Sequence, residues 1–290
     1  CDKNAEQNTE MIAFVEDVAS CSEKITVEYV DGEGFRFSVI KNGEDTGVSF
    51  RGIPNGHEFT SLLLAILNAD GQGKNIPDDT IVARIKALNG RVKIDTYVSL
   101  TCTNCPDVVQ ALNVMALVNP NISNEMVDGA LHQEEVSRLN IQGVPSVFVN
   151  GEPFHVGRGD IGTLLQKLED KVGTSHDENA LVQERNYDVV VLGGGPAGAS
   201  AAIYSARKGL HVAIVAERIG GQVNDTVGIE NVTSVAHTTG TKLSADMREH
   251  ISNYAIDVFE NRKLVEASLQ ENIKSIRVRG GGVFLAPAVI

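Results

Sequence analysis

Residues 92–118 read VKIDTYVSLTCTNCPDVVQALNVMALV, and this stretch decides the fold. Its first part, 92–98, is rich in β-branched and aromatic residues and predicts a strand. A helix is expected to follow the two cysteines. Cys102 and Cys105 are three positions apart at the junction, a spacing that places both sulfurs on one face of the first helical turn, close enough to form a disulfide.

The segment downstream of this stretch continues the alternation of strands and helices. A strand is expected near Met126, a helix near Val136, a hairpin over 144–156 and a last helix over 161–168. This order, with a dithiol at the start of the first helix, is the order of a thioredoxin-like α/β fold. Pro145 lies where thioredoxin-like proteins place a cis-proline against the dithiol, and an X-Pro bond is the one that readily adopts the cis form.

The location of the dithiol predicts redox chemistry. The unpaired N–H groups and the dipole of a helix N-terminus stabilise a thiolate, so Cys102 is the expected attacking sulfur and Cys105 the resolving one. The alternative is half of a zinc site. Cys1 and Cys21 do not form a second closely spaced pair, so no metal is expected and both are interpreted as incidental thiols.

The segment upstream of the dithiol has a pattern of its own. We expect a helix over 11–19, a hairpin of strands 24–30 and 35–40 around the turn 31–34, a strand over 48–51, and a helix over 59–67. A hairpin followed by a helix occurs again at 144–168, which suggests an internal duplication in which only the second copy has the cysteine pair.

Glu58 lies at the start of the upstream helix. Its carboxylate could face the dithiol across the paired folds and handle a proton during thiol exchange. The alternative is a solvated glutamate, since negative charge is favoured at a helix start.

A new domain is predicted after the polar linker 171–184. A strand over 187–192, a glycine loop, a helix over 199–208 and a strand over 211–216 form one βαβ unit. The loop residues are Gly193, Gly194, Gly195, Pro196, Ala197 and Gly198. In this setting a G-x-G-x-x-G loop binds the pyrophosphate of a dinucleotide, and Glu217, about twenty residues beyond it, could accept hydrogen bonds from a ribose. A glycine-rich turn without a ligand is the alternative.

Composition and charge narrow the function classes. Of 290 residues, 42% are hydrophobic and 22% charged, which is ordinary globular usage. The net charge of −13 disfavours nucleic acid and anionic membrane surfaces as partners. Four cysteines are too few for a disulfide framework, so a reducing, cytoplasmic location is expected. A mature lipoprotein also begins with cysteine, and this is the alternative for Cys1.

Five motifs together carry a family resemblance: 101–109 (TCTNCPDVV), 126–131 (MVDGAL), 143–145 (GVP), 193–198 (GGGPAG) and 217–222 (ERIGGQ). On these residues the chain resembles the flavoprotein subunit of bacterial alkyl hydroperoxide reductases, which is related to thioredoxin reductase. The resemblance implies two fused thioredoxin-like folds, at 1–85 and 86–172, a linker at 173–185, and the first part of a Rossmann-like FAD-binding domain at 186–290.

The resemblance also implies an electron path. Electrons would pass from NADH to FAD, to a dithiol beside the flavin, to Cys102 and Cys105, and finally to the disulfide of a separate peroxiredoxin. Residues implied at the FAD are the six of the glycine loop, Glu217, Gly221, Gln222 and Asn231. The whole protein would be a cytoplasmic homodimer. The family continues beyond the strand expected at 283–290, so this stretch alone is not expected to oxidise NADH.

Two other functions are consistent with the sequence. One is a thioredoxin-reductase-like enzyme that reduces protein disulfides in general. The other is a non-catalytic docking module built on the doubled fold, although a docking surface does not need the Cys102–Cys105 dithiol.

Overall fold

The computed structural model describes residues 8–30, 34–73, 75–175, 183–279 and 282–290. The chain forms two compact units, Cys1–Thr174 and Ser175–Ile290. Most of the predicted linker, at 176–182, lies outside the described residues.

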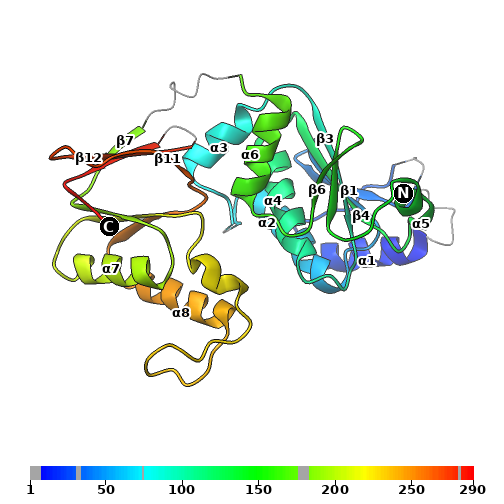
Figure 1. Cartoon of the computed structure of the whole chain (residues 1–290). Coiled ribbons are helices and arrows are strands. Elements are labelled where there is room, and N and C mark those ends of the chain that lie inside the picture. The colour runs from blue at the N-terminus through cyan, green and yellow to red at the C-terminus, as the bar shows by residue number, and fades with distance from the viewer. Residues whose placement is uncertain (1–7, 31–33, 74, 176–182, 280–281) are drawn as a thin grey trace. The chain divides into compact units, whose positions relative to one another are not determined.

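One six-stranded sheet organises the first unit (Figure 1). The strands β2 and β3 both run parallel to β4, which lies between them, and the two pairs at the edges are antiparallel hairpins. In sheet order the strands are β1 (Phe37–Lys41), β2 (Glu44–Arg51), β4 (Ile122–Asp128), β3 (Val92–Val98), β5 (Ser146–Val149) and β6 (Glu152–Val156).

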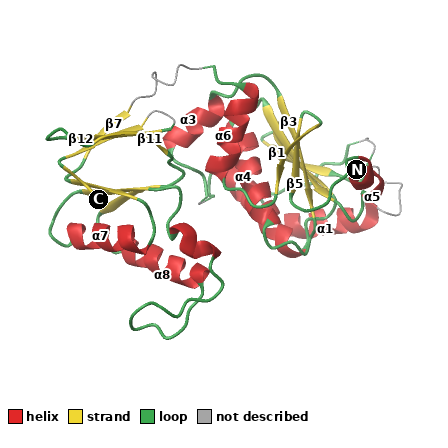
Figure 2. Cartoon of the chain, viewed as in Figure 1, coloured by secondary structure: helices red, strands yellow, loops and turns green. Residues whose placement is uncertain are grey.

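Most helices of this unit cover one face of the sheet (Figure 2). They are α1 (Asn8–Ser20), the 3-10 turn η1 (Gly56–Glu58), α2 (Phe59–Ala69), α3 (Asp79–Lys86), α4 (Cys105–Val118) and α6 (Ile161–Val172). The helix α4 contacts β2, β3 and β4 as well as α2, α3 and α6. Its residues Val108, Val109, Leu112 and Met115 are fully buried, so the helix that begins at the dithiol is the centre of the core.

The opposite face of the sheet carries the short helix α5 (Gln133–Arg138). Val136 of this helix packs against Tyr97, Val127 and Phe148, which form a separate small apolar cluster. The central strands of the sheet are therefore covered on both faces at this place.

The first hairpin differs from the prediction. β1 and β2 are joined at Asn42 and Gly43, which have φ values of 52° and 82°. An Asn-Gly pair with both residues left-handed is the favoured two-residue hairpin turn, and this signal is stronger than the glycine-rich 31–34 segment. The expected strand at 24–30 is therefore wrong, and the strands predicted at 35–40 and 48–51 are the two arms of this hairpin; residues 31–33 lie outside the described residues.

The second half of this unit agrees with the predicted order. The strand near Met126, the helix near Val136, the hairpin 146–156 and the helix from Ile161 are all present. The β1–β2 hairpin followed by α2 repeats the order of the β5–β6 hairpin followed by α6, at the two opposite edges of the sheet.

The second unit contains two four-stranded sheets. The parallel sheet has the order β10 (Ile256–Phe259), β9 (Val212–Val215), β8 (Val189–Leu192) and β14 (Ala288–Val289). The second sheet has the order β11 (Leu264–Ser268), β12 (Lys274–Val278), β13 (Gly282–Ala286) and β7 (Gln183–Asn186). The helices α7 (Pro196–Ala206) and α8 (Gly240–Ser252) pack with the parallel sheet around one apolar cluster, and a second cluster fills the space between the two sheets.

The predicted strand 283–290 is two strands in the structure. Pro287 separates β13 from β14, and the two belong to different sheets. Proline lacks the N–H that a continuous ladder needs, which accounts for the break.

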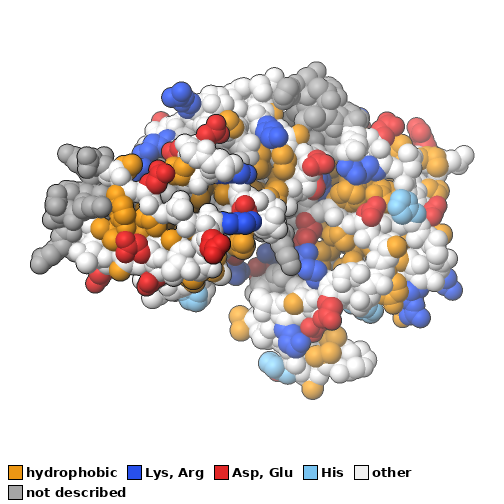
Figure 3. Space-filling view, turned by 180° about the vertical axis from the view of Figure 1, so that it is seen from behind, with side chains coloured by type: hydrophobic (Ala, Val, Ile, Leu, Met, Phe, Trp, Pro, Cys, Tyr) orange, Lys and Arg blue, Asp and Glu red, His pale blue; other side chains and the backbone are white. Residues whose placement is uncertain are grey.

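Surface charges are mixed on the face drawn in Figure 3. Lysine and arginine side chains lie among aspartates and glutamates there and do not gather into one basic patch. Among the described residues, the structure has no helix with the length and apolar character needed to cross a bilayer.

Candidate redox and nucleotide sites

The two cysteines of the 92–118 stretch form a disulfide. The helix α4 begins at Cys105, and Cys102 lies in the turn before it, where its N–H donates to the carbonyl of Ser99 at 2.9 Å. The prediction that both sulfurs lie on the first helical turn is therefore wrong for Cys102. Cys105 is completely buried and Cys102 is half-buried, so Cys102 is the sulfur that a partner can reach first.

The loop that contains Pro145 lies against the dithiol. The Val144–Pro145 peptide bond is cis, as the sequence predicts. The Sγ of Cys102 lies 3.8 Å from the carbonyl oxygen of Val144. The carbonyl of Pro145 accepts a hydrogen bond from the N–H of Gly157 at 2.9 Å. The loop after β6 therefore lies beside the Pro145 loop.

Arg158, in the loop after β6, reaches the dithiol turn. Its Nε donates to Oδ1 of Asn104 at 2.8 Å. The ring of buried His155 contacts the backbone of this loop. Its Nε2 lies 3.0 Å from the carbonyl oxygen of Gly157 and 2.8 Å from that of Arg158. Sequence reasoning missed Arg158, since 54 residues separate it from Asn104 and no local pattern joins them.

The turn η1 brings Glu58 beside the dithiol segment. The N–H of His57 donates to the carbonyl of Leu100, two residues before Cys102, at 3.2 Å. Glu58 is completely buried, and its Oε2 accepts from the hydroxyl of Ser61 at 2.7 Å. Ser61 in turn lies 3.4 Å from Nε2 of Gln110 on α4. The alternative of a solvated glutamate is therefore wrong.

Burial raises the pKa of the Glu58 carboxyl to about 7; the Ser61 hydrogen bond works against this rise, and the charge of Asp107 adds to it. A carboxyl that holds its proton in the folded state but loses it in the unfolded state near pH 4.5 makes the free energy of unfolding fall as the pH rises. We expect the loss to develop between about pH 4.5 and 7 and to reach on the order of 3 kcal/mol above that window.

Glu58→Gln is expected to remove this pH dependence and to stabilise the first unit at pH 8. Urea unfolding, followed by circular dichroism at several pH values, measures the free energy of unfolding of both proteins. Glu134→Gln, on the exposed side of α5, is the matched control. Parallel stability curves for wild type and Glu58→Gln across pH 4.5–8 would contradict the assignment.

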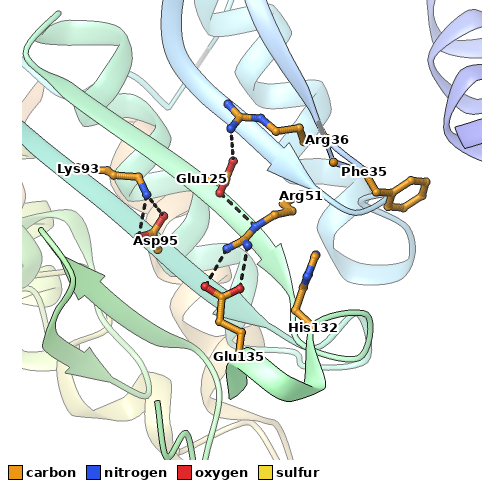
Figure 4. A pocket seen from close by; sticks show the side chains of 9 residues that line it. Phe35, Arg36, Arg51, Lys93, Asp95, Glu125, His132 and Glu135 are labelled. Atoms are coloured by element: carbon orange, nitrogen blue, oxygen red, sulfur yellow. Dashed lines mark hydrogen bonds and ion pairs between the residues drawn. The ribbon is translucent and has the colours of Figure 1, made fainter. Parts of the chain in front are cut away.

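A second cluster of charged residues lies on the α5 side of the sheet (Figure 4). Arg51 of β2 donates to Glu135 of α5 at 2.7 Å, and its Nε lies 3.2 Å from Glu125 of β4. The hydroxyl of Tyr97 also donates to Glu135 at 2.7 Å, and Arg36 lies 3.4 Å from Glu125. A cavity of about 570 Å³ opens beside them. Sequence reasoning missed this cluster as well.

This cluster joins the two halves of the six-stranded sheet. Burial tends to raise the pKa of the Glu135 carboxyl, but the hydrogen bonds from Tyr97 and Arg51 hold it below its ordinary range. Glu135 is therefore ionised at neutral pH, paired with Arg51. We interpret the cluster as structural, because Arg36 and Arg51 form ion pairs with Glu125 and Glu135.

The glycine loop of the second unit connects β8 to α7, at the carboxyl ends of the parallel strands. Gly193 has a φ of 116°, which only glycine adopts without strain. A Cβ on Gly198 would lie 2.0 Å from the carbonyl oxygen of Gly193, so glycine is required for this close approach of helix and loop. A Cβ on Gly195 would meet no atom within 4 Å, which leaves space in front of the loop.

The residues predicted to share the nucleotide site differ in where they lie. The N–H of Gly220 donates to the carbonyl of Gly194 at 2.7 Å, so the 220–222 turn with Gly221 and Gln222 is beside the glycine loop. Glu217 is exposed just after β9, at the same edge of the sheet. Asn231 is exposed in the loop before α8, which extends beyond the helices (Figure 1), and among the described residues no hydrogen bond joins it to the glycine loop.

The open space before Gly195, the helix N-terminus of α7 and the acidic Glu217 together fit the pyrophosphate and ribose of a dinucleotide. Among the described residues no group of three His, Cys, Asp or Glu side chains is arranged to hold an ion. Cys21 is an exposed free thiol, and Cys1 lies outside the described residues.

Comparison with known protein families matches both units. The thioredoxin domain family matches residues 91–168, and the pyridine nucleotide-disulphide oxidoreductase family matches residues 187–285. The first match contains the dithiol and the second contains the glycine loop.

Several curated relatives align with almost the whole chain. A protein of Bacillus subtilis named NADH dehydrogenase is 45% identical over 97% of this chain and 54% of its own length. AhpF, a component of the alkyl hydroperoxide reductase of Pseudomonas aeruginosa, is 42% identical over 99% of this chain and 56% of its own, and that of Staphylococcus aureus is 47% identical over 88% and 49%. The chain thus spans about half the length of these relatives.

A solved structure matches more than half of the chain. The NTD_N/C domain of the alkyl hydroperoxide reductase AhpF of Enterococcus faecalis is 32% identical, with a TM-score of 0.54, over 58% of this chain and 86% of the solved one. The dithiol turn, the glycine loop and these matches lead to one conclusion. The chain belongs to the AhpF family of alkyl hydroperoxide reductase components, a group of α/β disulfide oxidoreductases with thioredoxin-like domains.

Proposed function

We propose that the Cys102–Cys105 dithiol passes electrons to the disulfide of a peroxiredoxin, and that the whole protein thereby supports the reduction of alkyl hydroperoxides. One observation supports this above all: a half-buried Cys102 and a fully buried Cys105 form a disulfide at the start of the central helix of a thioredoxin-like domain. Accessibility of one sulfur and burial of the other suit an attacking and a resolving cysteine.

The transfer would take place in two exchanges. The thiolate of Cys102 attacks one sulfur of the partner disulfide, so that a mixed disulfide forms and the second partner sulfur leaves as a thiolate. The thiolate of Cys105 then attacks the Cys102 sulfur, re-forms the internal disulfide and releases the first partner sulfur. Two electrons move from this chain to the partner, and the two protons of the dithiol go with them.

Glu58 is proposed to hold one of those protons. Its carboxyl is buried on the turn that is bonded to Leu100, and a pKa of about 7 suits a group that accepts and returns a proton near neutral pH. Pro145 is proposed to shape the surface against which the partner disulfide docks, since its loop lies at Cys102.

The second unit is proposed to bind FAD. The glycine loop with the α7 N-terminus would hold the pyrophosphate, Glu217 the ribose, and Gly221 and Gln222 the isoalloxazine side, and Asn231 is a further candidate. FAD supplies the two-electron chemistry that links a nicotinamide to a dithiol. The name of the Bacillus subtilis relative supports NADH as the donor for the whole protein, which we propose to be a cytoplasmic homodimer.

Partner choice tests this function against general disulfide reduction. The purified chain, reduced and freed of reductant, is mixed with equal amounts of a peroxiredoxin disulfide or of oxidised insulin, and loss of the Cys102 and Cys105 thiols is followed in time. We expect the peroxiredoxin to react faster by on the order of 100-fold, a difference of about 3 kcal/mol in activation free energy. Equal rates would favour a general protein-disulfide reductase instead.

A further inference from the structure

The turn at 217–222 lies directly against the glycine loop. The N–H of Gly220 donates to the carbonyl of Gly194 at 2.7 Å. A Cβ on Gly194 would lie 2.4 Å from the carbonyl oxygen of Arg218, so the two backbones are in contact. The turn contains three of the residues that we propose to contact the nucleotide: Glu217, Gly221 and Gln222. A movement of the turn would therefore change the shape of the proposed nucleotide site.

The segment after β10 pairs with the start of this turn. The N–H of Asn261 donates to the carbonyl of Glu217 at 3.0 Å, and the N–H of Arg262 donates to that of Ala216, also at 3.0 Å. Asn261 has a φ of 58°, a left-handed conformation that asparagine adopts more readily than most residues. These backbone bonds keep Glu260, the residue before them, beside the turn.

The side chain of Glu260 connects the turn to helix α8. Its Oε1 accepts a hydrogen bond from the N–H of Ile219 at 2.8 Å. Arg248 of α8 donates to both carboxylate oxygens, from Nη1 at 2.6 Å and from Nη2 at 2.8 Å. Such a pair of parallel bonds fixes the orientation of a carboxylate. Only 26% of the Glu260 side chain is exposed, so solvent screens this contact less than an open surface pair.

The Glu260 carboxyl is ionised at neutral pH. Burial tends to raise its pKa, but the hydrogen bonds from Arg248 and from the Ile219 N–H hold it below its ordinary range. An ionised acceptor binds an N–H more strongly than a neutral one. The bond to Ile219 is therefore one of the stronger contacts that hold the turn.

We propose that Glu260 is a positioning residue of the nucleotide site: held by Arg248, it fixes the Ile219 peptide and thereby keeps the 217–222 turn against the glycine loop. This inference rests on the proposed function, in which that loop binds FAD. Glu260 is not proposed to contact the nucleotide itself. It is separated from Ile219 by 41 residues, so no local pattern in the sequence connects the two.

The first test is amide hydrogen exchange of the purified chain, followed by NMR. In Glu260→Ala the N–H of Ile219 loses its acceptor, and we expect it to exchange faster by at least on the order of tenfold. The N–H of Gly220 should also exchange faster, because its bond to Gly194 opens when the turn moves. Faster exchange at Ile219 alone would show a local loss and would overturn the proposal.

Two further variants separate the acceptor from its ion pair. Glu260→Gln retains an oxygen that can accept from Ile219, so it should recover most of the protection at both amides. Arg248→Ala leaves the carboxylate without its partner, and both amides should exchange about threefold faster. This variant carries the test if Glu260→Ala does not fold. Lys242→Ala, an exposed lysine of α8 that pairs with Asp246, is the matched control and should change neither rate.

FAD affinity is the second readout, measured by the change in flavin fluorescence as the chain is added. Glu260→Ala should bind FAD roughly tenfold more weakly than wild type, and Glu260→Gln should stay within about threefold of it. Faster exchange at both amides with unchanged FAD affinity would overturn the proposal, as would no recovery in Glu260→Gln. If the wild-type chain binds no FAD, the proposed cofactor is refuted, while the exchange rates still decide whether Glu260 positions the turn.

Discussion

Replacing Cys102 by serine is expected to abolish thiol-disulfide exchange with a peroxiredoxin, lowering the rate by at least on the order of 1,000-fold. A serine hydroxyl is not an anion near neutral pH and cannot form the mixed disulfide. Cys105 cannot replace the missing sulfur, because it is completely buried. The measurement is the rate of thiol loss after the reduced variant is mixed with the oxidised partner.

Cys21→Ser is the matched control, since Cys21 is an exposed thiol outside the dithiol turn. It should exchange at the wild-type rate. A Cys102→Ser variant that retained more than a tenth of the wild-type rate would show that another thiol attacks the partner, and the assignment of Cys102 would then be wrong.

Gly198→Ala is expected to destabilise the second unit by about 2–3 kcal/mol. The added Cβ would lie 2.0 Å from the carbonyl oxygen of Gly193, and this oxygen belongs to the backbone, so α7 must shift away from β8. Differential scanning calorimetry of the chain measures the unfolding of the unit. We expect its transition to move down in temperature while that of the first unit stays in place.

Gly195→Ala is the informative comparison. Its Cβ would meet no protein atom within 4 Å, and the backbone of Gly195 has an ordinary negative φ of −72°, so stability should be unchanged. The same methyl group would occupy the space proposed for the pyrophosphate. FAD affinity should therefore fall roughly tenfold or more, about 1.4 kcal/mol. Unchanged flavin binding in Gly195→Ala would contradict the assignment of the loop.

The thioredoxin-like half was predictable because its signals are local. The strand before Cys102, the helix after Cys105 and the hairpin over 144–156 each depend on a few neighbouring residues, and their order determines the topology. The glycine loop was predictable for the same reason. The first hairpin was misplaced because two turn signals compete there, and the Asn42-Gly43 pair is the one that forms the turn.

The contacts around the dithiol and those of the Arg51–Glu135 cluster depend on the tertiary fold. Arg158 meets Asn104 across 54 residues, and Arg51 meets Glu135 across 84. The burial of Glu58 depends on the docking of η1 against Leu100, since a carboxylate at a helix start is ordinarily solvated. Periodicity reports which face of an element is buried and not which side chains meet across the sheet.

The most direct test of the central claim is to trap the mixed disulfide. Cys105→Ser retains the attacking sulfur but cannot resolve the product, so a reduced variant mixed with an oxidised peroxiredoxin should accumulate a covalent one-to-one adduct. Peptide mass spectrometry of that adduct should find Cys102 bonded to a partner cysteine, and addition of a thiol reductant should release both proteins. An adduct through Cys21, or no adduct from a folded and reduced variant, would contradict the assignment of Cys102 as the sulfur that delivers electrons to a peroxiredoxin.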